Sequence, residues 1–452
     1  MFSRVLVANR GEIAVRIVRA LHELGIEAVA VYSTADADAL HVHLAERSVC
    51  VGPPAAAESY LRIPNIVAAA QTTGCEAIHP GYGFLAENPA FVHACEENGL
   101  VFIGPPAEVM ERMGDKVRAK EEMRAAGVPL VPGSDGTADL EGLRRAAIEA
   151  GFPVLLKAAS GGGGKGMRRV STDEELEDAF VAAAAEAEAA FGDGSLYLEK
   201  AVALARHVEI QVLCDTHGAV LTLGERECSI QRRHQKLIEE SPSAALDPAT
   251  REEMEAAVER ACTTIGYRNA GTFEFLLGPG GGFHFIEVNC RLQVEHPVSE
   301  LVTGLDIVRE QVRIAAGEGL ELVGRAPRRG HAIEIRINAE DPARAFAPAP
   351  GTVTRFRPPL GAGVRVDTAT SEGNEVTPYY DSLIAKIIVW DETRPAAISR
   401  ALRALSELEV EGIPTTRELA IDVLESAPFR GGDYSTSTLA ELQDRLPSLS
   451  PS

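Results

Sequence analysis

The stretch FIEVNCRLQVEH, residues 285 to 296, has an alternating polarity. Every second residue from position 287 onward is polar: Glu287, Asn289, Arg291, Gln293 and Glu295. Successive side chains of a β-strand point to opposite faces, so an extended segment would place these five groups in one row. A strand with one solvated face gives the same pattern. The alternative is a row of acids, amides and a guanidinium in a cleft, and the alternation alone favours neither.

The composition is that of an ordinary globular protein with an acidic balance. The chain has 452 residues, 45% hydrophobic and 24% charged, with a formal net charge of −22. This length predicts two to four domains. The negative charge argues against nucleic acid or an anionic membrane as the main partner, because either needs a broad basic surface. A small anionic substrate needs only a local basic pocket.

The seven cysteines are scattered and include no CxxC pair. Neither a disulfide framework nor a zinc site is therefore predicted. Residues 1–21 lack the core of a signal peptide, and no stretch approaches the ~20 apolar residues of a membrane-spanning helix. We expect a cytoplasmic protein whose thiols are reduced.

Strands and helices alternate in the first hundred residues. Apolar runs at 4–8, 27–33, 76–84 and 100–106 predict strands, and residues 9–25 predict an amphipathic helix. This order is typical of a parallel sheet with helices on its faces. Such a sheet presents ligands at its strand ends, here around residues 10–12 and 79–88, although the first turn lacks a GxGxxG fingerprint.

From about residue 113 the pattern changes twice. A helix that ends at Gly127 and Pro129 leads into an α+β part with an alanine-rich helix at 173–190, then strands and a basic loop. Beyond residue 329 the chain predicts a strand-rich domain with a late helix. The expected fold is thus a three-part mixture of α/β and α+β structure.

SGGGGKGM, residues 160–167, is the first candidate phosphate-binding element. It fails the P-loop pattern GxxxxGK[ST], because Ala159 and Gly166 occupy the first and last required positions. Four consecutive glycines still expose backbone N–H groups that can surround phosphate oxygens, and such a loop can move as a lid. The preceding apolar strand ends in Lys157 and favours a phosphate lid over a plain hairpin tip.

Glu274 and Glu287 belong to a predicted hairpin, GTFEFLL and FHFIEVN, joined by GPGGG. An even-length loop pairs the two glutamates on one face, whereas an odd-length loop pairs Glu274 with Ile286 and separates them. Adjacent carboxylates repel each other unless a cation lies between them. With the Asn289 carbonyl they form the hard oxygen set that Mg²⁺ takes beside nucleotide phosphates.

Two further segments carry charge in a regular pattern. SIQRRHQK concentrates Arg232, Arg233, His234 and Lys236, which in so acidic a chain favours anion binding over a solvated loop. HAIEIRINAE, residues 331–340, alternates like the opening stretch. By itself that second pattern predicts a half-exposed strand.

Nine segments occur in a characteristic order: HPGYGFLAEN, MGDK, GGGGKGM, RHVEIQV, SIQRRHQKLIEE, GTFEFL, EVNCRLQVEHPVSE, RGHAIEIRINAED and YYDSLIAKIIVW. Together they resemble the biotin carboxylases, the ATP-grasp subunits of biotin-dependent carboxylases, over residues 2 to 440. The resemblance implies a Rossmann-like N-terminal domain (1–113), an ATP-grasp domain (114–328) with a mobile lid at about 131–203, and a C-terminal biotin carboxylase domain (329–447).

The implied activity is ATP-dependent carboxylation of biotin by bicarbonate through carboxyphosphate. This is the first half-reaction of an acyl-CoA carboxylase, such as acetyl-CoA carboxylase of fatty acid biosynthesis. The implied cofactors are ATP and Mg²⁺ or Mn²⁺, and the family is homodimeric. No lysine between two methionines occurs here, so we expect the biotin carrier and the carboxyltransferase on other chains. Another ATP-grasp carboxylate–amine ligase is the alternative, and RLQVEHPVSE with RINAED in one chain speaks against it.

The resemblance also assigns residues. Those expected around the nucleotide are Lys116, Lys157, Gly163 and Gly164 at the phosphates, Glu199, Lys200, Val202 and Leu276 at the adenine side, and His207, Gln231 and His234 at the ribose and phosphates. Those expected to hold the metal are Glu274, Glu287 and Asn289. Those expected at bicarbonate are Lys236, Arg291, Gln293 and the Val294 backbone, with Glu295 as the base and Arg336 at biotin.

One residue departs from the family pattern. Cys290 stands where threonine or serine is usual. Alternation directs its side chain away from the polar row, so we expect little effect on the chemistry.

Overall fold

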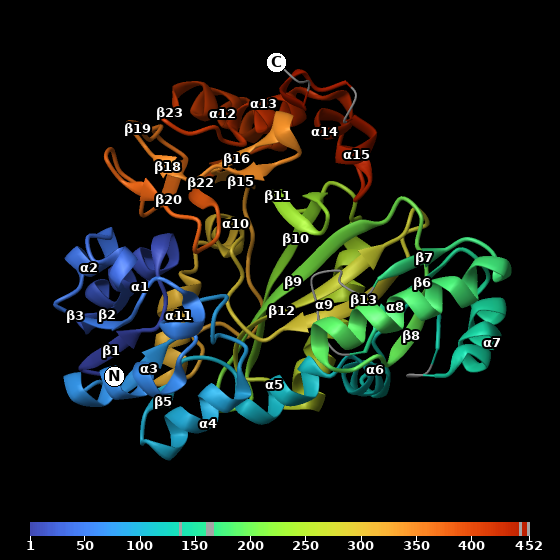
Figure 1. Cartoon of the computed structure of the whole chain (residues 1–452), viewed down its shortest axis with the longest axis horizontal. Helices are drawn as coiled ribbons and strands as arrows, with labels where there is room; N and C mark the ends of the chain where they lie inside the picture. Colours follow the sequence, from blue (N-terminus) through green and yellow to red (C-terminus); the bar gives the residue numbers. More distant parts are fainter. Residues whose placement is uncertain (135–137, 160–166, 443–444, 450–452) are drawn as a thin grey trace.

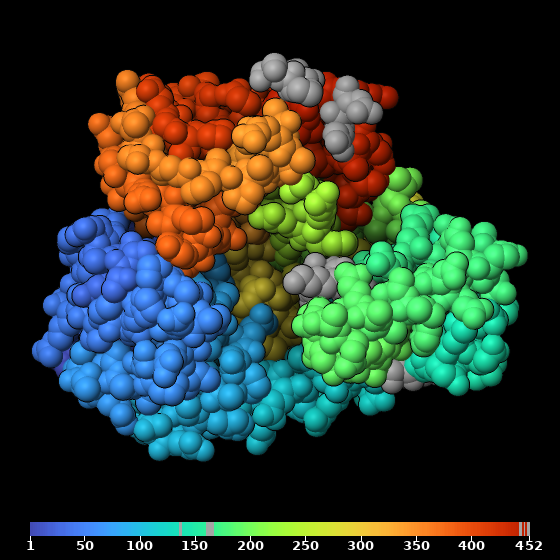
Figure 2. All heavy atoms as spheres, viewed as in Figure 1, coloured from blue at the N-terminus to red at the C-terminus, as the bar shows by residue number. Residues whose placement is uncertain are grey.

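The computed structural model describes residues 1–134, 138–159, 167–442 and 445–449. Figure 1 shows the N-terminal region, the lid and the C-terminal region arranged around a long central sheet. In the space-filling view of Figure 2, these three regions border a hollow. Among the described residues, no helix has the length and apolar character needed to cross a membrane.

The N-terminal region contains a parallel sheet, as predicted, with five strands in the order β3-β2-β1-β4-β5. Its strands are β1 (Arg4–Val7), β2 (Glu27–Ser33), β3 (Arg47–Gly52), β4 (Ala77–His79) and β5 (Val101–Phe102). Its main helices are α1 (Gly11–Glu23), α3 (Ile63–Thr73) and α4 (Pro89–Glu97). Strand β3 was not predicted, because this edge strand is largely exposed and offers no apolar run.

The central sheet has nine strands in the order β13-β12-β9-β10-β11-β15-β22-β20, with β14 paired to β10. The strands are β9 (Arg206–Cys214), β10 (Val220–Arg232), β11 (Gln235–Ser241), β12 (Asn269–Leu277), β13 (Phe283–Asn289), β14 (Gly324–Arg325), β15 (His331–Asn338), β20 (Val364–Thr368) and β22 (Leu383–Asp391). Its associated helices are α5 (Ala107–Gly114), α6 (Lys116–Ala125), α9 (Pro248–Ile265), α10 (His296–Thr303) and α11 (Ile307–Ala315). The sheet continues across residue 329, so one hydrogen-bonded framework joins the ATP-grasp part to the C-terminal part.

The lid is a small three-stranded sheet covered by two helices. Its strands are β6 (Val154–Ala158), β7 (Arg168–Val170) and β8 (Leu196–Lys200), and its helices are α7 (Leu140–Ala150) and α8 (Leu176–Phe191). Leu143, Val154, Leu156 and Leu198 belong to an apolar cluster of its own. The predicted phosphate glycines Gly163 and Gly164 lie outside the described residues.

The C-terminal region packs α12 (Arg394–Glu407) and α13 (Arg417–Glu425) against the far end of the central sheet. Three small strand pairs belong to this region: β16 (Glu340–Asp341) with β17 (Ala347–Pro348), β18 (Gly351–Thr352) with β21 (Glu375–Val376), and β19 (Arg355–Arg357) with β23 (Glu409–Glu411). The half-exposed strand expected at 331–338 is wrong. Strand β15 lies between β11 and β22, and every residue except the partly buried Arg336 is buried.

The metal-candidate hairpin has the predicted pairing for a different reason. Glu274 lies directly opposite Glu287, but the connecting loop, residues 278–282, is odd in length. Between Glu274 and Phe275 the register shifts, so that Phe275 pairs with Phe285 and Ile286 is the extra residue of a β-bulge. The bulge restores the pairing that the odd loop would prevent.

Candidate active site

The polar segment at residues 285–296 is only partly a strand. Strand β13 ends at Asn289, and residues 290–295 form a loop that leads into α10, whose first turn contains Pro297. The expectation of one extended row is therefore wrong beyond Asn289. The polar groups still meet, because Arg291 donates to the side-chain oxygens of Asn289 and Gln293, both at 2.9 Å. Cys290 packs in an apolar core, as its predicted orientation required.

Lys236 forms the centre of the site. Its Nζ lies 2.6 Å from Glu209 Oε2, 2.9 Å from Glu274 Oε1 and 2.6 Å from Glu295 Oε1. Burial by itself lowers the pKa of this ammonium, but the three carboxylates raise it well above its ordinary value. A permanently charged lysine is thus shared by acids from β9, β12 and the loop before α10.

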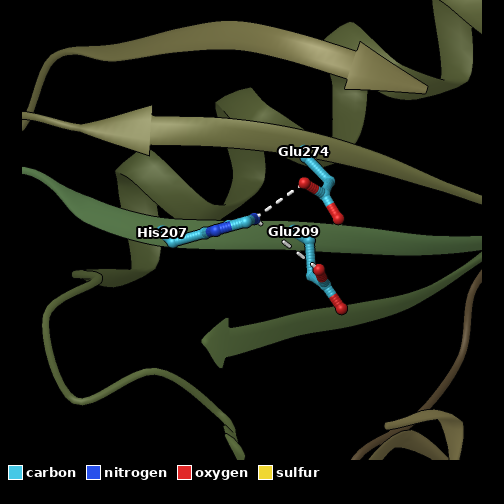
Figure 3. Close-up of side chains that lie close together, drawn as sticks. All are labelled: His207, Glu209 and Glu274. Carbon is cyan, nitrogen blue, oxygen red and sulfur yellow. Dashed lines mark ion pairs between the residues drawn. The ribbon is translucent and has the colours of Figure 1, made fainter. Parts of the chain in front are cut away.

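Two of these acids also face a histidine: in Figure 3, His207 points toward Glu274 and Glu209. Single ligand atoms of the three side chains lie within 4.8 Å of one another, with His207 Nε2 2.9 Å from Glu274 Oε2 and 3.9 Å from Glu209 Oε2. Burial opposes ionisation of Glu274, but Lys236 and His207 outweigh it and lower the pKa of that carboxyl. Lys236 already supplies this cluster with a positive charge.

The predicted metal set shares only Glu274 with that cluster. Glu287 lies opposite Glu274, its side chain is 38% exposed, and its oxygen is 3.6 Å from Lys116 Nζ. Asn289 lies on the same strand with its carbonyl oxygen accepting from Arg291, while its amide nitrogen is buried without a hydrogen-bond partner among the described residues. Two carboxylates and an amide oxygen at one edge of the hairpin fit a hard divalent cation.

Glu295 is held by two cations. Its side chain is fully buried, Lys236 donates to one oxygen, and Arg336 Nη2 donates to the other at 3.0 Å. Burial favours the protonated acid, yet Lys236, Arg336 and Arg226 outweigh it and lower the pKa of Glu295 well below its ordinary value. Arg336 Nε also donates to Glu239 at 2.6 Å. Burial is the main cause that raises the pKa of Glu239 to about 7.

The described residues expected around the nucleotide come from the lid, from the central sheet and, for Lys116, from α6. In the lid, Lys157 pairs with Glu199, and Lys200 donates to the backbone carbonyls of Gly151 and Phe152. In the sheet, Leu276 lies opposite His207, and Gln231 lies opposite Lys236. Val202 follows β8 directly, and His234 lies at the turn between β10 and β11.

The predicted basic loop is in fact a tight hairpin turn. Strand β10 extends to Arg232 and β11 begins at Gln235, which leaves only two residues between them. Arg233 and His234 both have positive φ, 48° and 70°, as a type I′ turn requires. The short turn fixes the direction in which Lys236 enters the site.

Sequence analysis missed several residues that support the site. Glu209 holds Lys236, Glu87 holds Arg291 at 2.7 Å, and the fully buried Arg226 holds Glu209 at 2.6 Å. The segment RHVEIQV has the same two-residue polar alternation as the opening stretch, with His207 and Glu209 on one face. That signal could have found Glu209. Arg226 lies between Glu225 and Glu227, in a run of charged residues without alternation, and its contacts arise only from tertiary packing.

Three stretches of the chain match described families. Residues 115–323 match the "Carbamoyl-phosphate synthase L chain, ATP binding domain", which identifies an ATP-grasp enzyme. Residues 1–110 match "Biotin carboxylase, N-terminal domain", and residues 334–441 match "Biotin carboxylase C-terminal domain". The class defined by fold and site is thus an ATP-dependent ligase.

Individual relatives give the narrower assignment. The chain is 54% identical over 436 residues to a biotin carboxylase of Pseudomonas aeruginosa, covering 96% of this chain and 97% of that one. A biotin carboxylase complex with β,γ-ATP from Campylobacter jejuni is 47% identical with a TM-score of 0.95, covering 98% and 99%.

A third relative is the biotin carboxylase domain dimer of Hydrogenobacter thermophilus 2-oxoglutarate carboxylase, with MgADP, ADP and bicarbonate. It is 50% identical with a TM-score of 0.94, and the match covers 98% of both chains. The chain belongs to the biotin carboxylase family.

Proposed function

We propose that the cluster around Lys236 is where bicarbonate is activated and biotin is carboxylated. The observation that carries this proposal is the buried contact of Lys236 and Arg336 with the same carboxylate, Glu295, at 2.6 and 3.0 Å. Two fixed cations beside a base suit a reaction that gathers two anions, bicarbonate and the biotin enolate, in one place.

Bicarbonate would bind between Lys236 and the loop before α10. Arg291, Gln293 and the Val294 backbone belong to this loop, and Glu87 and Asn289 hold the Arg291 guanidinium in place. An incoming anion competes with Glu295 for the charge of Lys236. Its arrival therefore raises the low pKa of Glu295 toward a value at which the carboxylate can take the bicarbonate proton.

The ATP phosphates would lie toward the lid. Lys116 and Lys157 offer positive charge there. Lys116 lies beside Glu287, and Glu199 pairs with Lys157 and with Lys120 and so holds Lys157 in place. Glu274, Glu287 and Asn289 would hold Mg²⁺, which neutralises charge on the transferred phosphoryl group. Transfer of the γ-phosphoryl group to bicarbonate releases ADP and forms carboxyphosphate.

Biotin would then meet Arg336. Carboxyphosphate breaks into CO₂ and phosphate, phosphate takes the ureido proton of biotin, and the resulting nitrogen nucleophile attacks CO₂. Arg336 is anchored by Glu239, so its guanidinium is aimed before negative charge develops on the ureido oxygen. A lid that closes over the hollow would protect carboxyphosphate from water.

The partner proteins, the oligomeric state and the cellular compartment are also part of the proposal. Biotin would arrive on a carrier protein, and a carboxyltransferase would pass the carboxyl group to an acceptor such as acetyl-CoA. The dimer named for the 2-oxoglutarate carboxylase relative supports a homodimer here. The seven cysteines all lie in described parts of the chain and are free, which supports a reducing compartment such as the cytoplasm.

We keep the domain boundaries 1–113, 114–328 and 329–447, with the lid at 131–203, as part of the proposal. The family matches begin and end close to these positions. Limited proteolysis would test the lid boundaries.

The test of function measures ATP hydrolysis by the purified chain with and without bicarbonate, and then with free biotin. We expect hydrolysis to require bicarbonate and to rise with biotin, and labelled bicarbonate to appear in carboxybiotin. ATP hydrolysis that is independent of bicarbonate and responds to an amine would instead indicate the carboxylate–amine ligase.

A further inference from the structure

Lys386 is a fully buried cation that touches the loop carrying Glu295 from behind. It lies on β22, its side chain is 0% exposed, and its Nζ donates to the backbone carbonyl of Val294 at 2.8 Å. The same Nζ lies 3.1 Å from Glu12 Oε1 on α1 and 3.8 Å from Asp367 on β20. One ammonium group thus joins the N-terminal region, the loop and the C-terminal region.

The strand register explains why Lys386 acts together with Arg336. Arg336 on β15 lies directly opposite Lys386 on β22, so the two cations share one face of the sheet. Like charges in this position normally destabilise a sheet, and burial adds to the cost. The two cations bind neighbouring residues: Arg336 donates to the Glu295 carboxylate and Lys386 donates to the Val294 carbonyl.

The charge of Lys386 is balanced by acids on neighbouring elements. Burial lowers its pKa, but Glu12, Glu334 and Asp367 outweigh that effect and raise it above the ordinary value. Asp367 also binds Arg365 through both oxygens, so it does not depend on Lys386. Glu334 is fully buried with both oxygens unpartnered among the described residues, and burial raises its pKa well above normal.

The hydrogen bond to the Val294 carbonyl fixes the backbone that carries the Glu295 side chain. The Val294 carbonyl and the Glu295 N–H belong to one planar peptide unit, so holding the oxygen sets the orientation of that plane. Arg336 fixes the far end of the Glu295 side chain and Lys386 fixes its origin. The base is therefore restrained at both ends.

We propose that Lys386 is a positioning residue for the carboxylation reaction, which aims Glu295 and the Val294 backbone at bicarbonate by holding the Val294 carbonyl. This inference rests on the proposed function, in which both residues serve bicarbonate. Lys386 itself does not touch the substrate. Its effect belongs to the bicarbonate-dependent step and leaves ATP binding alone.

The test uses the double variant Lys386→Met with Glu12→Gln, so that the nearest buried carboxylate is neutralised together with its cation. We expect kcat of bicarbonate-dependent ATP hydrolysis to fall roughly 10²-fold, the effect of a misplacement of about 1 Å, while KM for ATP stays within about twofold. KM for bicarbonate should rise. Steady-state kinetics and thermal unfolding are measured on the same preparations.

The matched control is Arg394→Met. Arg394 is a partly buried cation of α12 that holds Glu240 at 2.8 Å and the Phe429 carbonyl at 2.7 Å, away from the polar loop. It should lower Tm without changing the kinetic constants. The proposal would be overturned if both variants lost affinity for ATP and for bicarbonate in proportion to the decrease in Tm. A wild-type kcat in the double variant would overturn it as well.

If the double variant is not recovered folded, the single variant Glu12→Gln is used for the same kinetic test. Loosening the counterion of Lys386 should then lower kcat several-fold at unchanged KM for ATP, and a wild-type kcat would overturn the proposal. The wild type is assayed in parallel. If it does not fix bicarbonate into biotin at all, the proposed function fails, and that failure is distinct from any result for Lys386.

Discussion

The two ends of the polar segment from Glu287 to Glu295 differ more than their regular sequence pattern indicates. Glu287 is 38% exposed and faces one lysine at 3.6 Å, whereas Glu295 is fully buried and lies within 3.0 Å of two cations. The first end lies on a strand and the second in a loop that runs into a helix. One end is open to a ligand, and the other is fixed before any ligand arrives.

The difference has an energetic reason. A buried carboxylate loses its hydration and is stable only when paired charges and hydrogen bonds replace the water. Glu295 meets that requirement through Lys236 and Arg336, which are themselves held by Glu209 and Glu239. An exposed group such as Glu287 can wait for a cation because water solvates it meanwhile.

Replacing the buried acid should give the largest effect. Glu295→Gln keeps the shape but removes the proposed base, so kcat should fall roughly 10²–10⁴-fold while ATP affinity stays nearly intact. Steady-state kinetics of bicarbonate-dependent ATP hydrolysis, together with nucleotide titration, measure this. Full activity would refute the role of Glu295.

Replacing Arg336, the partner of Glu295, should affect biotin carboxylation and bicarbonate-dependent ATP hydrolysis to different extents. Arg336→Met removes the charge proposed to meet biotin, so biotin carboxylation should fall roughly 10²–10³-fold. Bicarbonate-dependent ATP hydrolysis should fall less, because Lys236 remains beside Glu295. Equal losses in the two assays would count against the assignment.

The pH dependence of the free energy of unfolding should show the effect of burying Glu239 near Glu295. The pKa of Glu239 is raised from an ordinary 4.5 to about 7, so the folded protein binds this proton more tightly than the unfolded chain does. Glu239 therefore contributes to the free energy of unfolding below pH 4.5, and this contribution is lost as the pH rises from 4.5 to 7. Glu239→Gln should remove that loss, up to about 3 kcal/mol, from the denaturant unfolding curves.

Comparison of wild type and Glu239→Gln at pH 5 and pH 8 isolates this group from the other acids. The variant should gain unfolding free energy relative to the wild type as the pH rises. A difference that is independent of pH would contradict the raised pKa.

Changing the open end should have the smallest effect. Glu287→Gln weakens the proposed oxygen set by one charge, so half-maximal activity should need about tenfold more Mg²⁺, which corresponds to ~1.4 kcal/mol. The Mg²⁺ dependence of the residual activity of Arg336→Met serves as the control and should be unchanged. An unaltered Mg²⁺ requirement in Glu287→Gln would place the metal elsewhere.

Local patterns predicted the N-terminal sheet because its strands β1 and β2 are continuous apolar runs, which only a buried parallel sheet accommodates well. They failed for β3, an edge strand without such a run. They left the loop length of the metal-candidate hairpin open, and the structure combines an odd loop with a bulge that absorbs the extra residue Ile286. The consecutive apolar residues Phe285 and Ile286 interrupt the alternation at this point, but whether a bulge forms there depends on the neighbouring strands.

By itself, the sequence determined which groups are available, through the polar alternation of residues 287–295, the alternation at 331–340 and the acidic hairpin. Side-chain periodicity is a local property, so those assignments needed no knowledge of the fold. Only the tertiary structure decided that Lys236, Glu209 and Glu295, separated by 27 and 59 residues, share one buried charge cluster. It likewise decided that Lys386 reaches the Val294 carbonyl, because such contacts depend on how sheets and loops pack, and burial then turns proximity into strong electrostatic coupling.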